Sequence, residues 1–336
     1  MGDRFLFVRT DADGAELKMR VERELLASRP DVELRGASCR TDDEVIEAAR
    51  DADVLLTNES FITRGVLSSL PKLRAVVRYG IGYDRVDLEA ATELGILIVN
   101  VPDFCQTEIA NHVMTFILAW NKRLIALNAG VRAGDWVGIR RTINSRMGPT
   151  AGQLLGIFGF GNTGRMVAKK ALALGMEVAA FSEHLTQADL GMGVRRMERD
   201  EMLRSCDFLS VNCALNAETY RALGAREFAM MKDSAVVINT ARGAVLDEEA
   251  LIGALRSGKI AGACLDVLEK EPPEPDNPLL AMENVLLTPH VAFYSSASVK
   301  KLAESVVREA LLCITPGQRP VNVVNKQVLE RPNRLT

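Results

Sequence analysis

The stretch LLGIFGFGNTG, residues 154–164, places an apolar run directly before three closely spaced glycines. The apolar run predicts a buried strand, and the apolar pattern of residues 165–174 predicts a helix after the glycines. A dinucleotide site needs such a turn: Gly159 bends tightly, Gly161 lets the backbone approach a pyrophosphate, and Gly164 lets helix and strand pack closely. The helix N-terminus then presents free N–H groups to the phosphates. The same spacing also occurs in plain strand–helix connections, but the flanking elements favour cofactor binding.

The position of this turn indicates a second domain, because about 150 residues precede it. A chain of 336 residues is long enough for about two domains. Its 48% hydrophobic and 25% charged residues match an ordinary globular protein with enough apolar mass for two cores. The net charge of −3 argues against nucleic acid as a partner, although a local basic patch stays open as an alternative.

The cysteines and the N-terminus indicate the compartment. The six cysteines have no C-x-x-C spacing, so the sequence predicts reduced thiols, no metal site and no disulfide framework. The sequence contains neither a signal peptide nor an apolar stretch of about 18 residues. We therefore expect a cytoplasmic protein that does not cross a membrane.

Short apolar runs alternate with amphipathic segments, which is typical of helices that cover a mostly parallel sheet. Besides the strand at 154–158, strands are predicted at residues 4–8, 53–57, 73–77, 96–101, 178–181, 208–212, 235–239, 262–267 and 285–288. One long helix over residues 107–133 is expected to cross to the second domain, and a last helix over 298–314 to return. The sequence therefore predicts a dinucleotide-binding unit inserted into a domain built from both ends of the chain.

Three histidines are the candidates for a proton donor near neutral pH: His112, His184 and His290. His112 falls inside the long predicted helix, which favours a structural role. His184 follows a predicted strand, close to where adenosine would lie. His290 ends the run LLTPH at 286–290, at the carboxyl end of a predicted strand, where open α/β sheets bind their ligands. Position therefore favours His290, without deciding its role.

An arginine and a glutamate follow two other predicted strands. Arg242 follows INTA at 238–241, and its planar guanidinium can hold a carboxylate through two parallel hydrogen bonds. Glu271 follows LDVLEK at 265–270 and has a carboxylate that could orient a histidine. Each has an alternative role, Arg242 as a surface ion-pair partner and Glu271 as a solvated loop acid. Together with His290 they predict an anion clamp, an acid-tuning carboxylate and a proton carrier.

Through these segments the chain resembles the D-isomer-specific 2-hydroxyacid dehydrogenases. NTARG at 239–243, LDV at 265–267 with Glu271-Pro272, and TPH at 288–290 match three signatures of that family in order. RYGIGYD at 78–84 and NVPD at 100–103 resemble its substrate-loop and hinge segments. The resemblance covers nearly the whole chain and is far more specific than the glycine turn.

The resemblance implies an α/β fold of two Rossmann-like domains with doubly wound parallel sheets and a cleft between them. A substrate-binding, flavodoxin-like domain would comprise residues 1–103 and 293–336, and an NAD(P)-binding Rossmann domain residues 104–292. The cofactor domain is thus inserted into a discontinuous substrate domain. The family also implies a homodimer formed around the cofactor domain.

By resemblance, the reaction is hydride transfer between a nicotinamide cofactor and C2 of a 2-oxo or D-2-hydroxy acid. Arg242 would bind the carboxylate, His290 would exchange a proton with the substrate oxygen, and Glu271 would orient His290 and favour its protonated form. The substrate-binding residues would be Tyr79, Gly80, Ile81 and Phe293, the first three through their backbone N–H groups. The cofactor-binding residues would be Thr107, Gly159, Gly161, Asn162, Thr163, Gly164, Ser182, Cys213, Thr240, Ala241 and Asp266, the last facing the nicotinamide carboxamide.

One position departs from the family pattern and bears on the cofactor. NAD-dependent members usually end the second Rossmann strand with Asp, whose carboxylate accepts from the ribose hydroxyls, whereas this chain has Ser182. Serine does not repel the 2′-phosphate of NADP, but Glu183 follows, and the first arginines after it are Arg195 and Arg196. We expect NAD, with NADP as the alternative.

A second class of function also fits part of the chain. HVAFYS at 290–295 and VNVVNK at 321–326 resemble the C-terminal-binding-protein branch, whose animal members are transcriptional corepressors. The alternatives are a corepressor-like, NAD(H)-dependent binding protein or a sensor of the nicotinamide redox state, each with little turnover. The particular substrate stays undetermined. Four aromatic residues are candidates to line its cleft and weakly favour an apolar side chain: Tyr79, Tyr83, Trp136 and Phe293.

Overall fold

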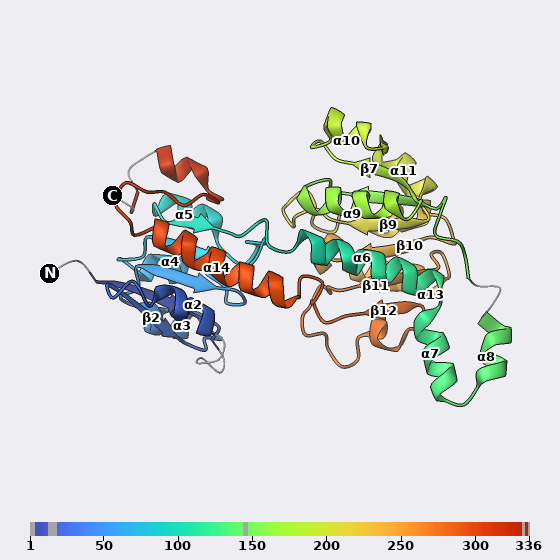
Figure 1. Cartoon of the computed structure of the whole chain (residues 1–336), viewed down its shortest axis with the longest axis horizontal. Helices are drawn as coiled ribbons and strands as arrows, with labels where there is room; N and C mark the ends of the chain where they lie inside the picture. The colour runs from blue at the N-terminus through green and yellow to red at the C-terminus, as the bar shows by residue number, and fades with distance from the viewer. Residues whose placement is uncertain (1–3, 13–18, 144–146, 331–332, 335–336) are drawn as a thin grey trace. The chain divides into compact units, whose positions relative to one another are not determined.

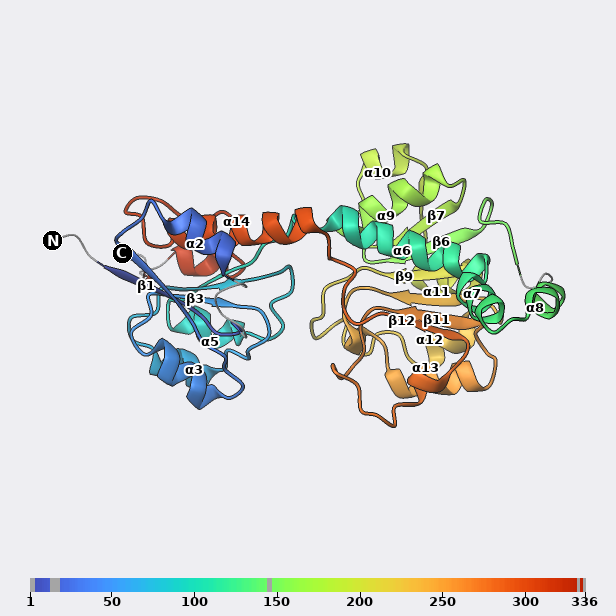
Figure 2. The ribbon, with the colours of Figure 1, turned by 60° about the horizontal axis from the view of Figure 1, so that its bottom comes forward.

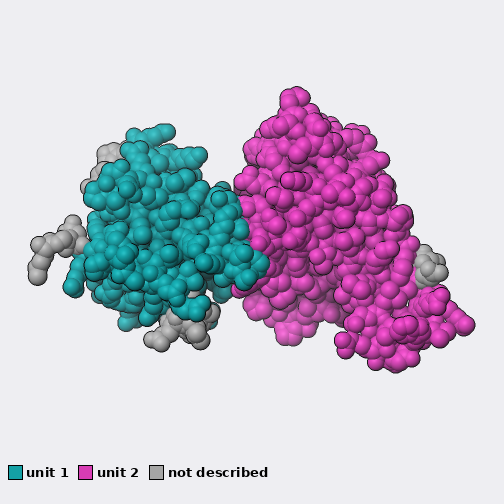
Figure 3. Space-filling view, in the orientation of Figure 1, with its two compact units in different colours: residues 1–104, 295–336 teal, residues 105–294 magenta. Residues whose placement is uncertain are grey.

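The computed structural model describes residues 4–12, 19–143, 147–330 and 333–334. The chain divides into two compact units, shown in different colours in Figure 3. Unit 1 comprises residues 1–104 and 295–336, and unit 2 comprises residues 105–294. The first border, after residue 104, lies one residue beyond the border expected from the sequence, and the second, after residue 294, lies two residues beyond it.

Unit 1 is built around a five-stranded parallel sheet in the order β2-β1-β3-β4-β5. Its strands are β1 (Phe5–Arg9), β2 (Val32–Gly36), β3 (Val54–Thr57), β4 (Ala75–Arg78) and β5 (Leu97–Val99). Strands β3 and β4 are buried along their whole length, as is typical of a parallel sheet covered on both faces. The sequence prediction missed β2, because this edge strand carries the exposed Glu33 and Arg35 between its apolar positions.

Both ends of the chain contribute to unit 1. Its helices are α2 (Arg20–Leu26), α3 (Asp42–Ala49), α4 (Arg64–Ser69), α5 (Leu88–Glu93), α14 (Ser296–Leu312) and the 3₁₀ helix η4 (Lys326–Glu330). The buried side chain of Asn325 accepts a hydrogen bond from the Ile98 N–H (2.8 Å) and donates one to the Ile96 carbonyl (2.9 Å). This contact attaches the C-terminal segment to β5, so the two ends of the chain form one unit.

Unit 2 contains a seven-stranded parallel sheet in the order β12-β11-β10-β9-β6-β7-β8. Its strands are β6 (Leu154–Phe158), β7 (Glu177–Phe181), β8 (Val194–Arg196), β9 (Phe208–Val211), β10 (Val236–Asn239), β11 (Gly262–Leu265) and β12 (Val285–Leu287). The chain runs outward from β6 to β8, returns to β9 beside β6, and continues to β12. The strand order therefore reverses between β6 and β9, where doubly wound sheets bind their ligands. Two parallel-sheet α/β units confirm the predicted fold class.

Helices cover both faces of the unit 2 sheet (Figures 1 and 2). Leu155 and Ile157 of β6 pack with α6 (Gln106–Asn121) and α9 (Asn162–Ala173), whereas Leu154 and Phe158 pack on the opposite face. That face is covered by α11 (Arg199–Ser205), α12 (Ala225–Met230) and α13 (Glu248–Arg256). Shorter elements are α10 (Gln187–Gly191), η2 (Gly243–Val245) and η3 (Pro278–Ala281). Successive side chains of β6 thus pack alternately into two separate hydrophobic cores, one on each face of the sheet.

The long helix expected over residues 107–133 is wrong as one element. It ends at Asn121, and Arg123 adopts a left-handed φ of +49°, so a separate helix α7 (Leu124–Arg132) begins there. A further helix, α8 (Trp136–Ile143), turns back against α7, and the two form a hairpin that projects from the body of unit 2 in both views (Figures 1 and 2). Neither glycine nor proline marks the break between α6 and α7, so it could not be predicted from the sequence.

Candidate active site

The carboxyl edge of the unit 2 sheet carries most of the residues that the sequence singled out. Because the seven strands are parallel, their carboxyl ends lie along one edge. The residues that follow the strands are Gly159 after β6, Ser182 after β7, Cys213 after β9, Thr240 to Arg242 after β10, Asp266 after β11 and Thr288 to His290 after β12. Strands β10, β11 and β12 are neighbours, so Arg242, Asp266 and His290 come from adjacent positions of this edge.

The glycine turn has the geometry that a pyrophosphate requires. Gly159 has a φ of +91°, and a side chain there would lie 2.6 Å from the backbone nitrogen of Cys213. A side chain at Gly164 would lie 2.6 Å from the Gly159 carbonyl oxygen. At Gly161, by contrast, a Cβ would meet no atom of the described residues within 4 Å. This glycine therefore borders open space at the N-terminus of α9, where the first N–H groups of the helix can bind an anion.

The loop after β10 adds a second feature that fits a dinucleotide. The Asn239 side chain accepts from the Ala241 N–H (3.0 Å) and donates to the Arg242 carbonyl (2.8 Å), which folds residues 240–242 into a tight turn. Within the described chain, the hydroxyl oxygen of Thr240 is buried and has no hydrogen-bond partner. A buried hydroxyl without a partner is costly, and a bound cofactor would supply one.

On the other side of the glycine turn, an arginine holds the loop that follows β7. Arg165 donates from Nε and Nη2 to the Asp189 carboxylate at 3.0–3.2 Å, and from Nη2 to the His184 carbonyl at 2.6 Å. The hydrogen bonds from Arg165 outweigh burial and lower the pKa of Asp189 to about 2. Ser182 accepts from the His184 N–H at 3.1 Å. The sequence indicated Ser182 but missed the Arg165–Asp189 pair that supports its loop.

The structure brings His290 and Glu271 together: Nδ1 of His290 lies 2.7 Å from Oε2 of Glu271. Burial would raise the pKa of Glu271, but the hydrogen bonds from His290 and from the Leu268 N–H, with the charges on His290 and Arg242, outweigh burial and lower it. Glu271 is therefore ionised near neutral pH. Because Nδ1 faces Glu271, Nε2 is the ring nitrogen that remains for a ligand.

Arg242 lies close enough to Glu271 for its charge to lower the pKa of that carboxyl. The two loops meet at Gly243, where a Cβ would lie 1.9 Å from the carbonyl carbon of Leu268. Only glycine allows this approach, so the turn that carries Arg242 packs directly on the loop that leads to Glu271. Arg242, Glu271 and His290 thus come together at one part of the edge, although 48 positions separate the first from the last.

Two further residues singled out in the sequence lie at this edge. The Phe293 ring packs edge-to-face on the His290 ring, with 6.3 Å between their centroids, and stacks on Tyr294. Cys213 follows β9 beside Gly159, and burial raises the pKa of its thiol to about 11. Cys213 is therefore a protonated packing group rather than a nucleophile.

The remaining candidates are placed differently from what we expected. Tyr79 in unit 1 is buried, its hydroxyl donates to Glu22 (2.6 Å), and its N–H donates to the Thr57 carbonyl (2.9 Å). Its N–H is thus not available to a substrate carboxylate, which leaves Gly80 and Ile81 for that role. Thr107 is exposed in the first turn of α6, and Trp136 is 69% exposed on α8, beyond the opposite end of α6.

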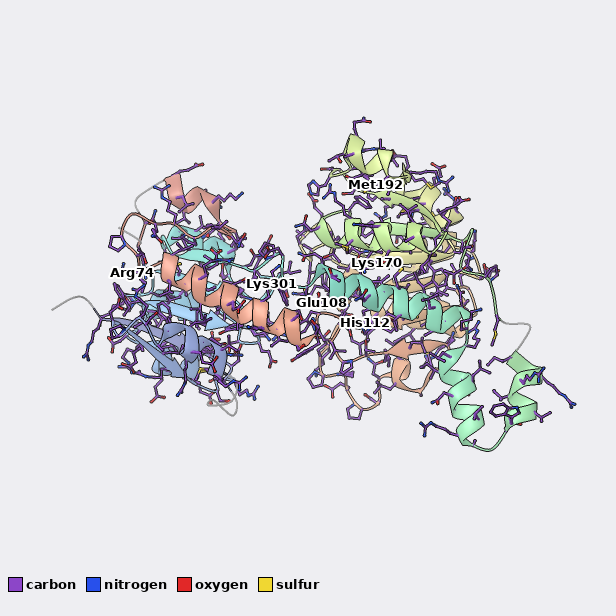
Figure 4. All side chains as sticks on the ribbon, in the orientation of Figure 1. Arg74, Glu108, His112, Lys170, Met192 and Lys301 are labelled. Carbon is purple, nitrogen blue, oxygen red and sulfur yellow. The ribbon has the colours of Figure 1, made fainter. Side chains whose placement is uncertain are left out.

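Asp266 has partners that the sequence did not reveal. Its carboxylate is buried and accepts from the Thr288 hydroxyl (2.5 Å) and from the N–H groups of Val291 (2.9 Å) and Ala292 (2.8 Å). His112, labelled on α6 in Figure 4, places Nε2 2.9 Å from the Thr288 oxygen. A contact between Asp266 and a carboxamide stays a prediction. No sequence signal joins His112 to Thr288, because 176 positions separate them.

Two properties concern the described residues as a whole. They contain no group of three or more His, Cys, Asp or Glu side chains placed to hold a metal ion. None of their helices combines the length and the apolar character that crossing a bilayer requires.

A doubly wound sheet with a glycine turn at its reversal point, and with a histidine, a carboxylate and an arginine at the same edge, defines the class: a dinucleotide-dependent oxidoreductase. The family follows from comparison with known proteins. The family model described as D-isomer specific 2-hydroxyacid dehydrogenase, NAD binding domain, matches residues 114–292. This chain belongs to that family, and its cofactor is a nicotinamide dinucleotide.

Relatives with known names fall in the same family. Glyoxylate reductase of Thermococcus litoralis is 36% identical over 291 residues, which cover 85% of this chain and 87% of that protein. D-3-phosphoglycerate dehydrogenase of Methanocaldococcus jannaschii is 36% identical over 296 residues, which cover 87% of this chain but only 55% of that protein. Among solved structures, a glyoxylate reductase from Paecilomyes thermophila aligns with a TM-score of 0.86 and 30% identity, covering 97% of this chain and 100% of that one.

Proposed function

We propose that this protein transfers a hydride between NAD(P)H and a 2-oxo acid, forming a D-2-hydroxy acid, and catalyses the reverse reaction with the same residues. The observation that carries the proposal is the 2.7 Å contact between His290 and Glu271, beside Arg242, at an edge that fits a dinucleotide. The relatives named glyoxylate reductase and D-3-phosphoglycerate dehydrogenase support this reaction class. The D configuration rests on the family alone.

Each side chain has a distinct task in this proposal. Arg242 binds the substrate carboxylate and polarises the neighbouring carbonyl. In reduction, protonated His290 donates its Nε2 proton to the carbonyl oxygen, and in oxidation the neutral ring takes that proton back. Glu271 stays ionised and accepts from Nδ1–H in both directions, so it fixes the ring and stabilises the imidazolium. The nicotinamide, when bound, supplies or accepts the hydride.

Binding of the substrate involves further residues in this proposal. The N–H groups of Gly80 and Ile81 bind the carboxylate, and Gly80 has a φ of +147° that favours glycine. Phe293, which packs against His290, contacts the substrate side chain. Both assignments support a small acid whose carboxylate is the main anchor.

Two substitutions test the chemistry directly. His290→Ala and Arg242→Ala should each lower kcat/KM for a panel of 2-oxo acids at least ~100-fold, the usual scale for a lost proton donor or transition-state contact. Arg256→Ala is the matched control, because Arg256 is an exposed arginine in the last turn of α13, and its kcat/KM should match that of the wild type. Near-wild-type turnover in either site variant would remove that residue from the mechanism.

The same assay separates enzyme from binding protein. NADH binding without consumption of NADH by any 2-oxo acid would contradict the proposed function. That result would favour the corepressor-like binding protein or the redox sensor instead. Rapid consumption with at least one small 2-oxo acid is the outcome that we expect.

We propose NAD as the preferred cofactor, because the arginines nearest in sequence to Ser182 are already engaged. Arg165 binds Asp189, Arg195 contacts the Glu177 carboxylate at 2.6 Å, and Arg196 donates to the Leu185 carbonyl at 3.0 Å. The exposed Glu183 directly follows Ser182 and would repel a 2′-phosphate.

A comparison of kcat/KM for NADH and NADPH tests this preference. We expect kcat/KM for NADH to exceed that for NADPH at least ~10-fold. A tenfold ratio corresponds to only about 1.4 kcal/mol, which repulsion between Glu183 and a 2′-phosphate can supply. Glu183→Gln should narrow the ratio, whereas Glu218→Gln, at another exposed glutamate of unit 2, should leave it unchanged. A preference of the wild type for NADPH would overturn the assignment.

We further propose a homodimer that forms through the α7–α8 hairpin. No residue of α7 is buried, and Leu124, Ile125, Trp136 and Val137 of the hairpin are each more than half exposed. Apolar surface of this kind, concentrated on one projecting element, is typical of a protein interface. The homodimer that the family implies would cover it.

A cytoplasmic location completes the proposal. No disulfide joins the six cysteines, all of which lie in the described part of the chain. Burial raises the pKa of Cys206 to about 12, and raises those of Cys264 and Cys313 further, so these thiols stay protonated. Buried, protonated thiols fit a reducing compartment, and the location of a tagged protein in cell fractions tests this.

A further inference from the structure

The turn that carries His290 has an unusual backbone conformation. His290 has a φ of +54°, in the left-handed region that residues with a side chain seldom adopt. It follows β12 after Thr288 and Pro289, so no regular element holds it. Strained residues of this kind persist only where the surrounding structure fixes them.

Asp266 provides that fixation. The N–H of His290 donates to the Asp266 carbonyl (2.8 Å), and the next two N–H groups, of Val291 and Ala292, donate to its two carboxylate oxygens (2.9 and 2.8 Å). Three successive N–H groups thus end on one residue, which itself follows the neighbouring strand β11. Two of these three hydrogen bonds end on the Asp266 carboxylate, so its orientation holds the two residues that follow His290.

The Asp266 carboxylate is in turn held by the Thr288 side chain, which His112 contacts, and the hydrogen bonds between these three residues can run in only one direction. An ionised carboxylate only accepts, so the Thr288 hydroxyl, 2.5 Å from Oδ1, must donate its single proton to Asp266. The Thr288 oxygen can then only accept from a nitrogen, so His112 must donate from Nε2 across 2.9 Å. The Asp266 carboxylate is 3.8 Å from Nε2, too far for a direct hydrogen bond.

The surroundings of His112 agree with this direction. Its ring packs edge-to-face on Phe116, with 4.5 Å between the centroids, and its side chain is 19% exposed. Burial lowers the pKa of His112, against the opposing effect of the Asp266 charge, so the ring is neutral near pH 7. A neutral ring has one N–H, and the geometry assigns it to Nε2.

We propose that His112 and Thr288 are positioning residues that act through Asp266 to hold His290 in its left-handed conformation. The proposal rests on the proposed function, in which His290 must present Nε2 to the substrate oxygen. Neither His112 nor Thr288 touches the reacting atoms in this proposal. Loss of this hydrogen-bond chain should therefore misplace the proton donor without weakening the binding of the substrate carboxylate to Arg242.

Thr288 offers a matched pair of substitutions. Thr288→Val keeps the shape and removes the hydroxyl, and it should lower kcat about tenfold while the KM for the 2-oxo acid stays within about twofold. Thr288→Ser keeps the hydroxyl and should stay within about twofold of the wild-type kcat. A fall of kcat in Thr288→Ser equal to that in Thr288→Val would show that the hydroxyl is not the active group, and would overturn the proposal.

A double variant tests whether His112 acts through Thr288. His112→Leu should lower kcat about threefold, because Thr288 and Asp266 remain. In Thr288→Val the hydrogen bonds between His112, Thr288 and Asp266 are already lost, so adding His112→Leu should lower kcat no further. Independent, multiplying effects would overturn the link between the two residues.

A spectroscopic measurement on the cofactor-free protein keeps the inference separate from activity. With only three histidines in the chain, ¹⁵N-histidine labelling yields few ring signals to assign. We expect His112 as the Nε2–H tautomer, and we expect Thr288→Val, but not Thr288→Ser, to move the ring signals of both His112 and His290. The proposal would be overturned if His112 were the Nδ1–H tautomer. It would also be overturned if the His290 ring signals were the same in Thr288→Val and in the wild type. Absence of turnover in the wild type would refute the proposed function alone, because the spectra would still test the hydrogen bonds from His112 through Thr288 to Asp266.

Discussion

Replacing Asp189 with asparagine should weaken unit 2 by removing the charge beneath the loop that follows β7. The Asp189 carboxylate accepts from Arg165 and also from the Thr186 N–H (2.9 Å) and the Thr186 hydroxyl (2.7 Å). Asparagine keeps the shape and one acceptor oxygen, so it can still cap α10 through Thr186. The substitution therefore separates the ion pair with Arg165 from the packing of the loop.

The magnitude follows from the pKa of Asp189, which is about 2 instead of 3.8. Each pKa unit corresponds to about 1.4 kcal/mol, so the pair contributes at most about 2.5 kcal/mol at pH 7. It is an upper value, because the Arg165 side chain is 32% exposed and solvent screens the interaction. Since the folded-state pKa is lowered, this stability is fully present above about pH 4 and is lost as the pH falls through about 2. At pH 3 the two proteins should differ by only about 1 kcal/mol.

Urea unfolding followed by tryptophan fluorescence measures this difference. Both tryptophans, Trp120 and Trp136, belong to unit 2, so the signal reports on the unit that contains Asp189. Asp233→Asn is the control, because Asp233 pairs with Lys259 but is 78% exposed, and its loss should cost less than about 0.5 kcal/mol. Equal stability of Asp189→Asn and wild type at pH 7, or an equal difference at pH 7 and pH 3, would refute the reasoning.

Three further predictions concern the site and the hairpin. Glu271→Gln should lower kcat/KM for 2-oxo acids at least ~10-fold, because glutamine can still contact Nδ1 of His290 but lacks the charge that stabilises the imidazolium; kcat/KM equal to that of the wild type would contradict it. Gly161→Val should raise the KM for NADH at least ~10-fold without changing urea unfolding, because its side chain enters open space at the N-terminus of α9, and a matching loss of stability would show that the space is not open. Trp136→Glu should convert a dimer to a monomer in sedimentation equilibrium, whereas Tyr220→Glu, at another exposed aromatic residue, should not; an unchanged mass for Trp136→Glu would exclude the hairpin as the interface.

The fold could be predicted from the sequence where burial is complete. Strands such as β6 and β11 are covered on both faces, so every residue is apolar or small and the run stands out. The edge strands β2 and β8 were missed for the opposite reason: β8 carries the exposed Arg195 and Arg196 and has only three residues. The break at Arg123 was missed because a left-handed arginine has no signature in the sequence.

In the site, the positions of residues that follow strands could be predicted from the sequence, whereas contacts between residues far apart in the sequence could not. Residues that follow a parallel strand within three positions, such as His290 and Ser182, could be predicted to lie at one edge, because topology alone places them there. Their supports could not be predicted. Asp189 meets Arg165 across 24 positions and His112 meets Thr288 across 176, and only the folded chain brings such pairs together.

The segment NTARG, residues 239–243, shows why a short motif can specify chemistry. Only Arg242 in it carries a charge, yet Asn239 bridges both ends of the turn, and Gly243 admits the backbone of Leu268 where any Cβ would collide. An arginine placed after a strand without these two neighbours would not be held against the loop of Glu271, and its guanidinium would be an ordinary surface charge. The motif therefore encodes a position for the arginine rather than its charge alone. For that reason we expect Arg242→Lys, which keeps the charge but not the planar fork, to behave more like Arg242→Ala than like the wild type in the kcat/KM assay with 2-oxo acids. Activity of Arg242→Lys close to that of the wild type would show that charge suffices and that the fixed position is not needed.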